Sequence, residues 1–247
     1  MENHGKYGEL IYTHNANDLY VNFFIPSTLN WKEKELQVQQ QTTFPESEVT
    51  ELKITIKKPQ QFAILFRYPS WVKDGALKAY VNKKEVTVKR NADSYATVAR
   101  VWKTGDVLTI KLPMEMRAEF LPDSSSWLSF VRGPIVLAAA TDTTGLKGLK
   151  ADDSRMGHIA NGPLYPIEEA PMIVAADKNK ITSLQPVKGK SLTYTASSIV
   201  YPAKFKDLQL VPFYKVHDSR YMLYWRYATP AQLETIKEEI RRREDER

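Results

Sequence analysis

Histidines are the residues of this chain most able to do chemistry, because an imidazole can bind a metal or carry a proton near neutral pH. The four are His4, His14, His158 and His217. A metal site needs three or four ligands that converge on one point. We expect His217 to hydrogen bond within a turn, and His4 to lie on a helix surface, where it is a candidate for carbohydrate contact.

Five tryptophans raise a second kind of chemistry, because exposed coplanar rings can stack on sugars. Trp71 follows Pro69-Ser70 at a strand end, and Trp102 and Trp225 stand within alternating strands, so we expect these to be packed in a core or a domain interface. Trp31 lies in an expected loop after Pro26. It is therefore the tryptophan that we consider a candidate for carbohydrate contact.

Several other chemistries are excluded or unsupported. The chain has no cysteine, which removes disulfides, thiolate metal ligands and cysteine nucleophiles. Acidic pairs such as Asp152-Asp153 would point to opposite faces of a strand, so they form no dyad by themselves. Gly145-Leu146-Lys147-Gly148 lacks the spacing of a phosphate loop. We expect no catalytic, cofactor-binding or metal-binding residue in this chain.

The net charge of +6 raises the question of nucleic acid, but the basic residues are spread over many expected strands and turns. The most charged run, Lys237 to Arg247, has five basic and five acidic residues. No apolar run approaches the length that spans a bilayer. We expect neither a nucleic-acid partner nor a membrane partner. No signal peptide is visible, and the cellular compartment stays open.

The two ends of the chain are expected to be helical. Glu2 to Thr13 has helical spacing, with Tyr7, Leu10 and Ile11 on one face that a short helix cannot bury alone. We expect this helix to be the last piece of a larger preceding domain. Near the other end, Thr229, Pro230 and Gln232 form a capping box with proline at the first helical position.

Between these helices the hydrophobic period is two, which is typical of strands. The expected strands begin at Leu19 to Ile25 and include a near-continuous apolar run from Phe62 to Tyr68. A turn at Asn82-Lys83-Lys84 predicts a hairpin. No alternation of strands and helices is visible. The fold class is therefore predicted as mostly β, an antiparallel, jelly-roll-like β-sandwich with a second, smaller β region and short terminal helices.

Composition predicts five segments. Residues 1–16 are the helix remnant, 17–140 a β-sandwich domain, 141–170 a connection, 171–228 a second small β domain, and 229–247 a C-terminal helix with a charged tail. The connection is placed where Thr, Asp, Gly, Lys and Pro lose all periodicity. The alternative is that the later strands complete the first sandwich.

Ordered motifs across nearly the whole chain resemble a known family. They begin with Glu2-Asn3-His4-Gly5-Lys6-Tyr7-Gly8-Glu9 and Leu19-Tyr20-Val21-Asn22-Phe23-Phe24-Ile25-Pro26-Ser27, followed by Gln41-Thr42-Thr43-Phe44-Pro45, Phe66-Arg67-Tyr68-Pro69-Ser70-Trp71 and Tyr80-Val81-Asn82. They continue with Arg100-Val101-Trp102, Gly105-Asp106 and Arg132-Gly133-Pro134-Ile135-Val136, and end with Leu210-Val211-Pro212-Phe213-Tyr214 and His217-Asp218-Ser219-Arg220-Tyr221. In this order the motifs resemble the bacterial β-L-arabinofuranosidases, glycoside hydrolase family 127.

The resemblance implies that this chain is the C-terminal β-sandwich portion of such an enzyme. The family's catalytic (α/α)₆ barrel, its zinc-bound cysteine pair, its acid/base glutamate and its substrate-binding histidines would all lie before Glu2. His4 would border the active-site region. A retaining glycosidase needs a nucleophile and an acid/base group. We therefore expect this chain alone to be inactive, to need no cofactor, and to belong to a periplasmic or secreted bacterial parent.

Three functions remain open from the sequence. The first is support of the parent's catalytic barrel, with homodimer formation as a further role. The second is a free-standing carbohydrate-binding module that binds plant-type glycans through exposed tryptophans. The third, a basic scaffold for nucleic acid or an acidic polymer, is the weakest. A large exposed apolar patch on the first sandwich would favour barrel support.

Overall fold

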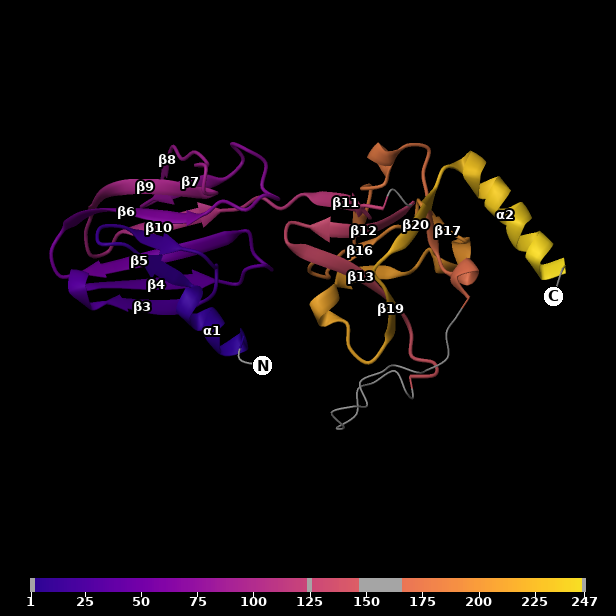
Figure 1. Ribbon diagram of the computed structural model, residues 1–247, viewed down its shortest axis with the longest axis horizontal. Helices are drawn as coiled ribbons and strands as arrows, with labels where there is room; N and C mark the ends of the chain where they lie inside the picture. The colour runs from indigo at the N-terminus through magenta and orange to yellow at the C-terminus, as the bar shows by residue number, and fades with distance from the viewer. Residues whose placement is uncertain (1–2, 124–125, 147–165, 246–247) are drawn as a thin grey trace. The chain divides into compact units, whose positions relative to one another are not determined.

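The computed structural model describes residues 3–123, 126–146 and 166–245, and divides the chain into two compact units, Met1–Glu115 and Met116–Arg247 (Figure 1). Both units are built mainly of antiparallel strands, which confirms the predicted mostly-β fold class. Each unit has a hydrophobic core of its own. No helix in these described ranges is long and apolar enough to cross a membrane.

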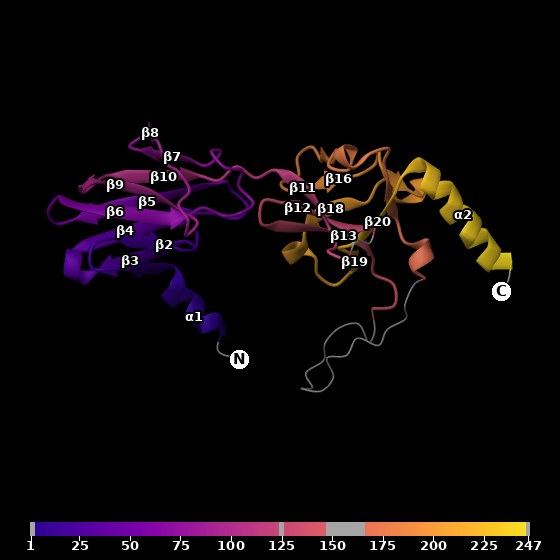
Figure 2. The ribbon, with the colours of Figure 1, turned by 45° about the horizontal axis from the view of Figure 1, so that its top comes forward.

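The first unit begins with one helix and continues as ten strands and a 3-10 turn. In chain order these are α1 (Asn3–Leu10), β1 (Tyr12–His14), β2 (Leu19–Val21), β3 (Ser27–Trp31), η1 (Lys32–Lys34), β4 (Leu36–Thr42), β5 (Val49–Ile56), β6 (Gln60–Arg67), β7 (Lys78–Val81), β8 (Lys84–Val86), β9 (Tyr95–Trp102) and β10 (Val107–Lys111). The helix projects from the strands in both ribbon views (Figures 1 and 2).

Two sheets form this sandwich. One has four strands in the order β1-β2-β6-β9, and the other has six in the order β3-β4-β5-β10-β7-β8. In the longer strands the residues that face the partner sheet alternate with outward ones and are mostly apolar, with Gln40 and Thr50 as buried polar exceptions. The largest fully buried side chains between the sheets are those of Trp102, Tyr68, Phe66, Leu19, Leu52, Ile54, Ile64, Leu108, Ile110 and Leu112.

The hairpin predicted at Asn82 is confirmed. Strands β7 and β8 pair antiparallel, and the two loop residues Asn82 and Lys83 both have positive φ, at 50° and 68°. Two successive residues with positive φ match the twist of a tight hairpin. The Asn82 side chain also receives the backbone N–H of Val107 at 2.9 Å, which fixes the loop beside the next strand.

The second unit holds the remaining elements. Its strands are β11 (Met116–Phe120), β12 (Trp127–Arg132), β13 (Ile135–Asp142), β14 (Met172–Val174), β15 (Gln185–Pro186), β16 (Tyr194–Thr195), β17 (Val200–Tyr201), β18 (Gln209–Pro212), β19 (Arg220–Met222) and β20 (Trp225–Ala228). Its helical elements are η2 (Ile167–Glu169), η3 (Lys178–Lys180), η4 (Ala203–Phe205), η5 (Phe213–Lys215) and α2 (Pro230–Asp245). All ten strands belong to one sheet.

The C-terminal helix begins as predicted. The backbone N–H of Thr229 donates to Gln232 Oε1 at 2.9 Å, and the N–H of Gln232 donates to Thr229 Oγ1 at 3.3 Å. This reciprocal pair is a capping box. Leu233 and Ile236 then pack on Met172 and Ala228, so the helix is fixed to its sheet by a small apolar cluster.

Two boundaries differ from the sequence-based assignment. The first helix ends at Leu10 rather than Thr13, because Tyr12 to His14 pair with β2. The division between the units lies at Glu115 rather than near residue 140. Strands β12 and β13 pair with β18 and β20, more than 70 residues later, and periodicity along the chain carries no information about such distant partners. Most of the connection expected at 141–170 lies outside the described residues.

Candidate functional site

The two histidines whose side chains the structure describes, His14 and His217, belong to no group that could hold a metal. His14 is in β1, with its ring centroid 4.6 Å from that of Trp31. His4 belongs to α1 and its side chain lies outside the described residues, as does the whole of His158. In the turn around His217, the hydrogen bond is made by Ser219, whose Oγ donates to the carbonyl of Asp142 at 3.0 Å. Within the described ranges, no three His, Asp or Glu side chains are grouped to hold a metal.

The tryptophans are mostly core residues. Trp102 and Trp225 are fully buried, as expected, and the indole N–H of Trp102 donates to the carbonyl of Phe62 at 3.1 Å. Trp31 differs from its expectation, since it ends β3 instead of standing in a loop and is only 4% exposed. Because β3 pairs along its whole length with β4, the Trp31 ring turns into the core and offers almost no surface to a sugar.

The outward face of the four-stranded sheet is the clearest candidate for a functional surface. Its strand register places one set of residues on the side away from the core, and we call this set the apolar face. It comprises Thr13, Tyr20, Gln61, Ala63, Leu65, Arg67, Tyr95, Thr97, Ala99 and Val101. Arg67 is its single charged residue, and Val101 is 52% exposed. The solvent-facing side of an antiparallel sheet is normally polar, so the composition of this face departs from the usual pattern.

A network of aromatic rings organises the apolar face. The Tyr20 and Tyr95 rings meet edge to face at 5.5 Å, and the Arg67 guanidinium lies 4.6 Å from the centre of the Tyr95 ring. The Tyr95 hydroxyl donates to Asn22 Oδ1 at 2.6 Å. These contacts hold three large side chains in fixed positions, and fixed side chains lose little entropy when a partner docks.

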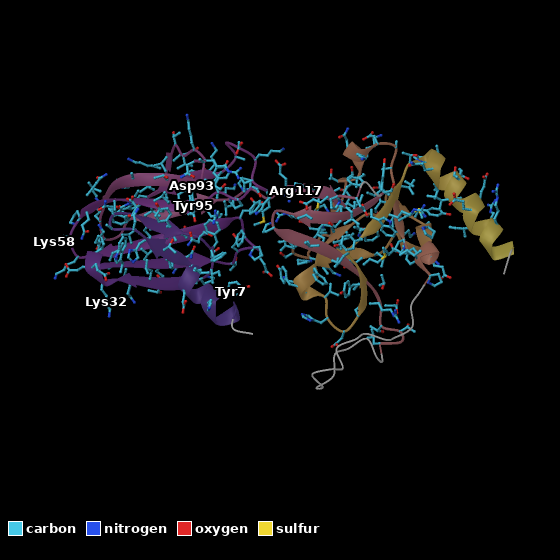
Figure 3. The ribbon with its side chains drawn as sticks, viewed as in Figure 1. Tyr7, Lys32, Lys58, Asp93, Tyr95 and Arg117 are labelled. Carbon is cyan, nitrogen blue, oxygen red and sulfur yellow. The ribbon has the colours of Figure 1, made fainter. Side chains whose placement is uncertain are left out.

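Asn22 connects this face to the first helix. Its amide donates to the carbonyl of Leu10 at 3.0 Å and to Thr13 Oγ1 at 3.2 Å. The C-terminal end of α1 is therefore tied to the edge of the apolar face. On the helix, the side chains of Tyr7 and Leu10 are 50% and 48% exposed (Figure 3 labels Tyr7 and Tyr95).

More apolar side chains are exposed just after β2, where Phe23 and Ile25 are each 39% exposed. Their carbonyls accept hydrogen bonds from the buried amide of Gln40, at 3.1 and 2.9 Å. The same amide donates to the hydroxyl of Tyr12 at 3.2 Å. Burial raises the pKa of Tyr12 above its ordinary value, against the smaller opposing effect of its hydrogen bonds to Ser27 and Gln40. The hydrogen bonds of Gln40 therefore hold the backbone of this exposed apolar turn in place.

The outward face of the six-stranded sheet has the opposite character, and we call it the polar face. Its residues are mostly polar, with two valines among them: Thr28, Asn30, Gln37, Gln39, Gln41, Val49, Glu51, Lys53, Thr55, Lys78, Tyr80, Glu85, Val107, Thr109 and Lys111. Polar contacts across its strands include Gln37 Nε2 to Asn30 Oδ1 at 2.9 Å and the Lys78–Glu85 ion pair at 2.9 Å. The polar side chains of this face can hydrogen bond to one another and to water.

Sequence reasoning missed the apolar face, although a signal for it was present. The run from Phe62 to Tyr68 is apolar at both alternating sets of positions, apart from Arg67, which is consistent with a central strand of a sandwich. In the structure, Phe62, Ile64 and Phe66 are buried, whereas Ala63 and Leu65 remain partly exposed. A strand that is apolar on two faces within a two-layer sandwich indicates a third layer.

Comparison with known families matches both units. Residues 18–114 match the family model described as "Beta-L-arabinofuranosidase, GH127 middle domain". Residues 117–227 match a family model described as a domain of unknown function. The two matched ranges meet at the division between the compact units. A comparison with curated protein sequences gives no significant match.

Solved structures give the same fold. The chain is similar to the crystal structure of a GH127 β-L-arabinofuranosidase from Geobacillus stearothermophilus T6, with a TM-score of 0.60, 15% identity, and coverage of 90% of this chain and 35% of that one. It is also similar to a structure named as a glycoside hydrolase (TM-score 0.57, 20% identity, coverage 88% and 37%). A GH127 β-arabinofuranosidase has a TM-score of 0.58, 19% identity, and coverage of 89% and 37%. The chain thus spans little more than a third of each.

Proposed function

Residues 18–114 of this chain belong to the family of GH127 middle domains, and from this premise we propose that the chain is the non-catalytic β-sandwich portion of a β-L-arabinofuranosidase-like glycoside hydrolase. Its work is to support a catalytic (α/α)₆ barrel that precedes it in a longer parent chain. The observation that carries this proposal is the apolar face, a preorganised sheet surface with one charge. The small share of each solved enzyme that the chain spans supports it as well.

The apolar face and α1 suit a helical partner physically. Small residues such as Ala63, Thr97 and Ala99 let helices approach the sheet closely, while Tyr20, Leu65 and Tyr95 supply apolar area. Each Å² of apolar surface removed from water contributes about 25 cal/mol. The partly exposed Arg67 can pair with a carboxylate or with carbonyls at a helix C-terminus, which fixes orientation more than affinity.

We place the zinc that the family resemblance implies outside this chain. Cysteine is absent from the sequence, and the described His, Asp and Glu side chains form no metal-binding group. A thiolate nucleophile and its metal would have to come from the barrel. The chain's own contribution is a rigid surface, so we place no chemical step in it.

Two measurements test the proposal. We expect the purified chain to release no arabinose from aryl β-L-arabinofuranosides above the level of a mock preparation, and real turnover would overturn the non-catalytic role. We also expect the coding sequence to continue upstream of Met1 in frame and to encode a cysteine pair shortly before Glu2. An in-frame stop codon with a ribosome-binding site directly before Met1 would contradict barrel support.

A further inference from the structure

The second unit contains a pocket that barrel support does not use. It has a volume of about 350 Å³ and is lined by residues of η2, η4 and the paired strands β13 and β19. Figure 1 labels these two strands. Its polar lining residues include Asp142, Glu169, Lys204 and Arg220, and its aromatic ones are Phe205 and Tyr221. This volume falls in the range of roughly 300 to 1,000 Å³ that is usual for small-ligand sites.

Arg220 makes the pocket wall rigid. Its Nε donates to the carbonyl of Thr144 at 2.7 Å and one terminal nitrogen donates to the carbonyl of Gly145 at 3.3 Å. The same guanidinium lies 3.9 Å from Asp142 Oδ1, and only 13% of the Arg220 side chain is exposed. The wall that carries Asp142 is therefore set before any ligand arrives.

Asp142 keeps capacity for a ligand. Its Oδ1 accepts the backbone N–H of Thr144 at 2.7 Å and faces Arg220. In the described part of the chain no hydrogen bond reaches Oδ2, and the side chain is 35% exposed. Glu169 and Lys204, across the pocket, are both exposed, so carboxylates and an ammonium group can each bond a hydroxyl.

Tyr221 supplies the aromatic surface. Its side chain is 49% exposed, and its ring centroid lies 5.1 Å from that of Phe213, which steadies the ring without covering it. A half-exposed ring beside polar groups of both signs suits a molecule with apolar C–H faces and many hydroxyls. The two carboxylates of Asp142 and Glu169 and the two cations of Lys204 and Arg220 leave the lining without net charge, which favours a neutral ligand, and the charged groups disfavour a purely apolar one.

We propose that this pocket binds one or two residues of a neutral glycan, with Tyr221 as the stacking wall and Asp142, Glu169 and Lys204 as hydrogen-bond partners. The pocket is independent of the apolar face. The choice of probe, an arabinose-containing glycan, and the role of the site in a glycoside hydrolase rest on the proposed function. In such a parent the site would tether the polysaccharide to the enzyme without taking part in bond cleavage.

Titration calorimetry on the whole chain tests this site with arabino-oligosaccharides of two to four residues, and with cello-oligosaccharides as a second panel. We expect millimolar or tighter binding of at least one probe. Tyr221→Ala should weaken it by at least about tenfold, which corresponds to roughly 1.4 kcal/mol. Asp142→Asn, which keeps the acceptor to Thr144, should weaken it less.

Tyr224→Ala is the matched control, because Tyr224 is 51% exposed but does not line the pocket. Circular dichroism melting of each variant separates lost binding from lost folding. Unchanged binding by folded Tyr221→Ala protein would overturn the proposal. Absence of binding to both oligosaccharide panels would overturn it as well. A dimer seen by light scattering that Tyr221→Ala dissociates would also overturn it, in favour of a protein interface. None of these outcomes bears on barrel support.

Discussion

The outward faces of the two sheets in the first unit differ in the types of residue that they present. Both are the solvent sides of strands that share one core, yet the four-stranded sheet presents Tyr20, Leu65 and Val101 where the six-stranded sheet presents glutamines, lysines and glutamates. Folding of the sandwich requires only the inner faces. This difference is what we expect if, as proposed, a partner covers one outward face and water covers the other.

The largest expected difference in stability is between substitutions on the inward and the outward side of β6. Phe66 is fully buried and its neighbour Leu65 belongs to the apolar face. Phe66→Ala should destabilise the isolated chain by about 3–5 kcal/mol because it leaves a cavity, and Leu65→Ala should cost less than about 2 kcal/mol because its site is open. Urea unfolding followed by tryptophan fluorescence measures both. Equal losses would mean that Leu65 is a folding residue.

A charge placed on each outward face should reveal which one is covered. Thr97→Asp on the apolar face should speed thermal inactivation of a barrel-containing parent by at least about tenfold, because an unpaired carboxylate would be buried at the joint. Gln39→Asp on the polar face is the matched control and should change nothing. In the isolated chain both variants should melt alike. An equal effect of the two variants on inactivation would argue against a preferred docking face.

Alkaline pH should lower the stability of the folded chain through the buried hydroxyl of Tyr12, which lies beneath the exposed turn after β2. Burial raises the pKa of Tyr12, so above the ordinary tyrosine value the unfolded chain loses this proton while the folded chain keeps it. The folded state then binds more protons, and stability falls as the pH rises through that window. Tyr12→Phe should flatten this part of the stability–pH curve. If the stability of both proteins falls equally with pH above about 10, Tyr12 is not the cause of the pH dependence.

The smallest effect is expected on the polar face. Gln39→Ala removes an exposed side chain from a sheet surface that water already satisfies, and it should alter the free energy of unfolding by no more than about 0.5 kcal/mol. The corresponding test on the apolar face is Val101→Ala in the barrel-containing parent, which should cost more there than in the isolated chain. Chemical unfolding of both proteins gives the two numbers. If Gln39→Ala lowers the free energy of unfolding as much as Leu65→Ala does, the two outward faces do not differ in their contribution to stability as expected.

Local features of the fold were predictable because they depend on neighbours in the chain. The hairpin at Asn82-Lys83 and the capping box at Thr229 are set by a few adjacent residues, and both are present. The end of α1 was not predictable. Its last turn competes with the pairing of Tyr12 against Val21, and that pairing depends on tertiary contacts.

The candidate site was less predictable than the fold. Trp31 looked exposed because it follows Pro26 among polar residues, whereas its strand register turns it inward. Arg220 and Asp142 are 78 positions apart in the sequence, and only the pairing of β13 with β19 brings them together. Residues that meet through non-local strand pairing leave no periodic signal in a single sequence.

Chemical labelling of single cysteines tests the central claim most directly. Because residues 1–247 contain no cysteine, Thr97→Cys and Gln39→Cys each introduce one reporter into this part of the protein, on the apolar and the polar face respectively, and peptide identification separates it from the cysteine pair expected in the barrel. Maleimide labelling is timed in the isolated chain and in the barrel-containing parent, with the labelled peptide identified by mass spectrometry. The account predicts that joining the barrel slows labelling at position 97 by at least about tenfold and leaves position 39 unchanged. Unchanged labelling at 97, or slowed labelling at 39 alone, would contradict it.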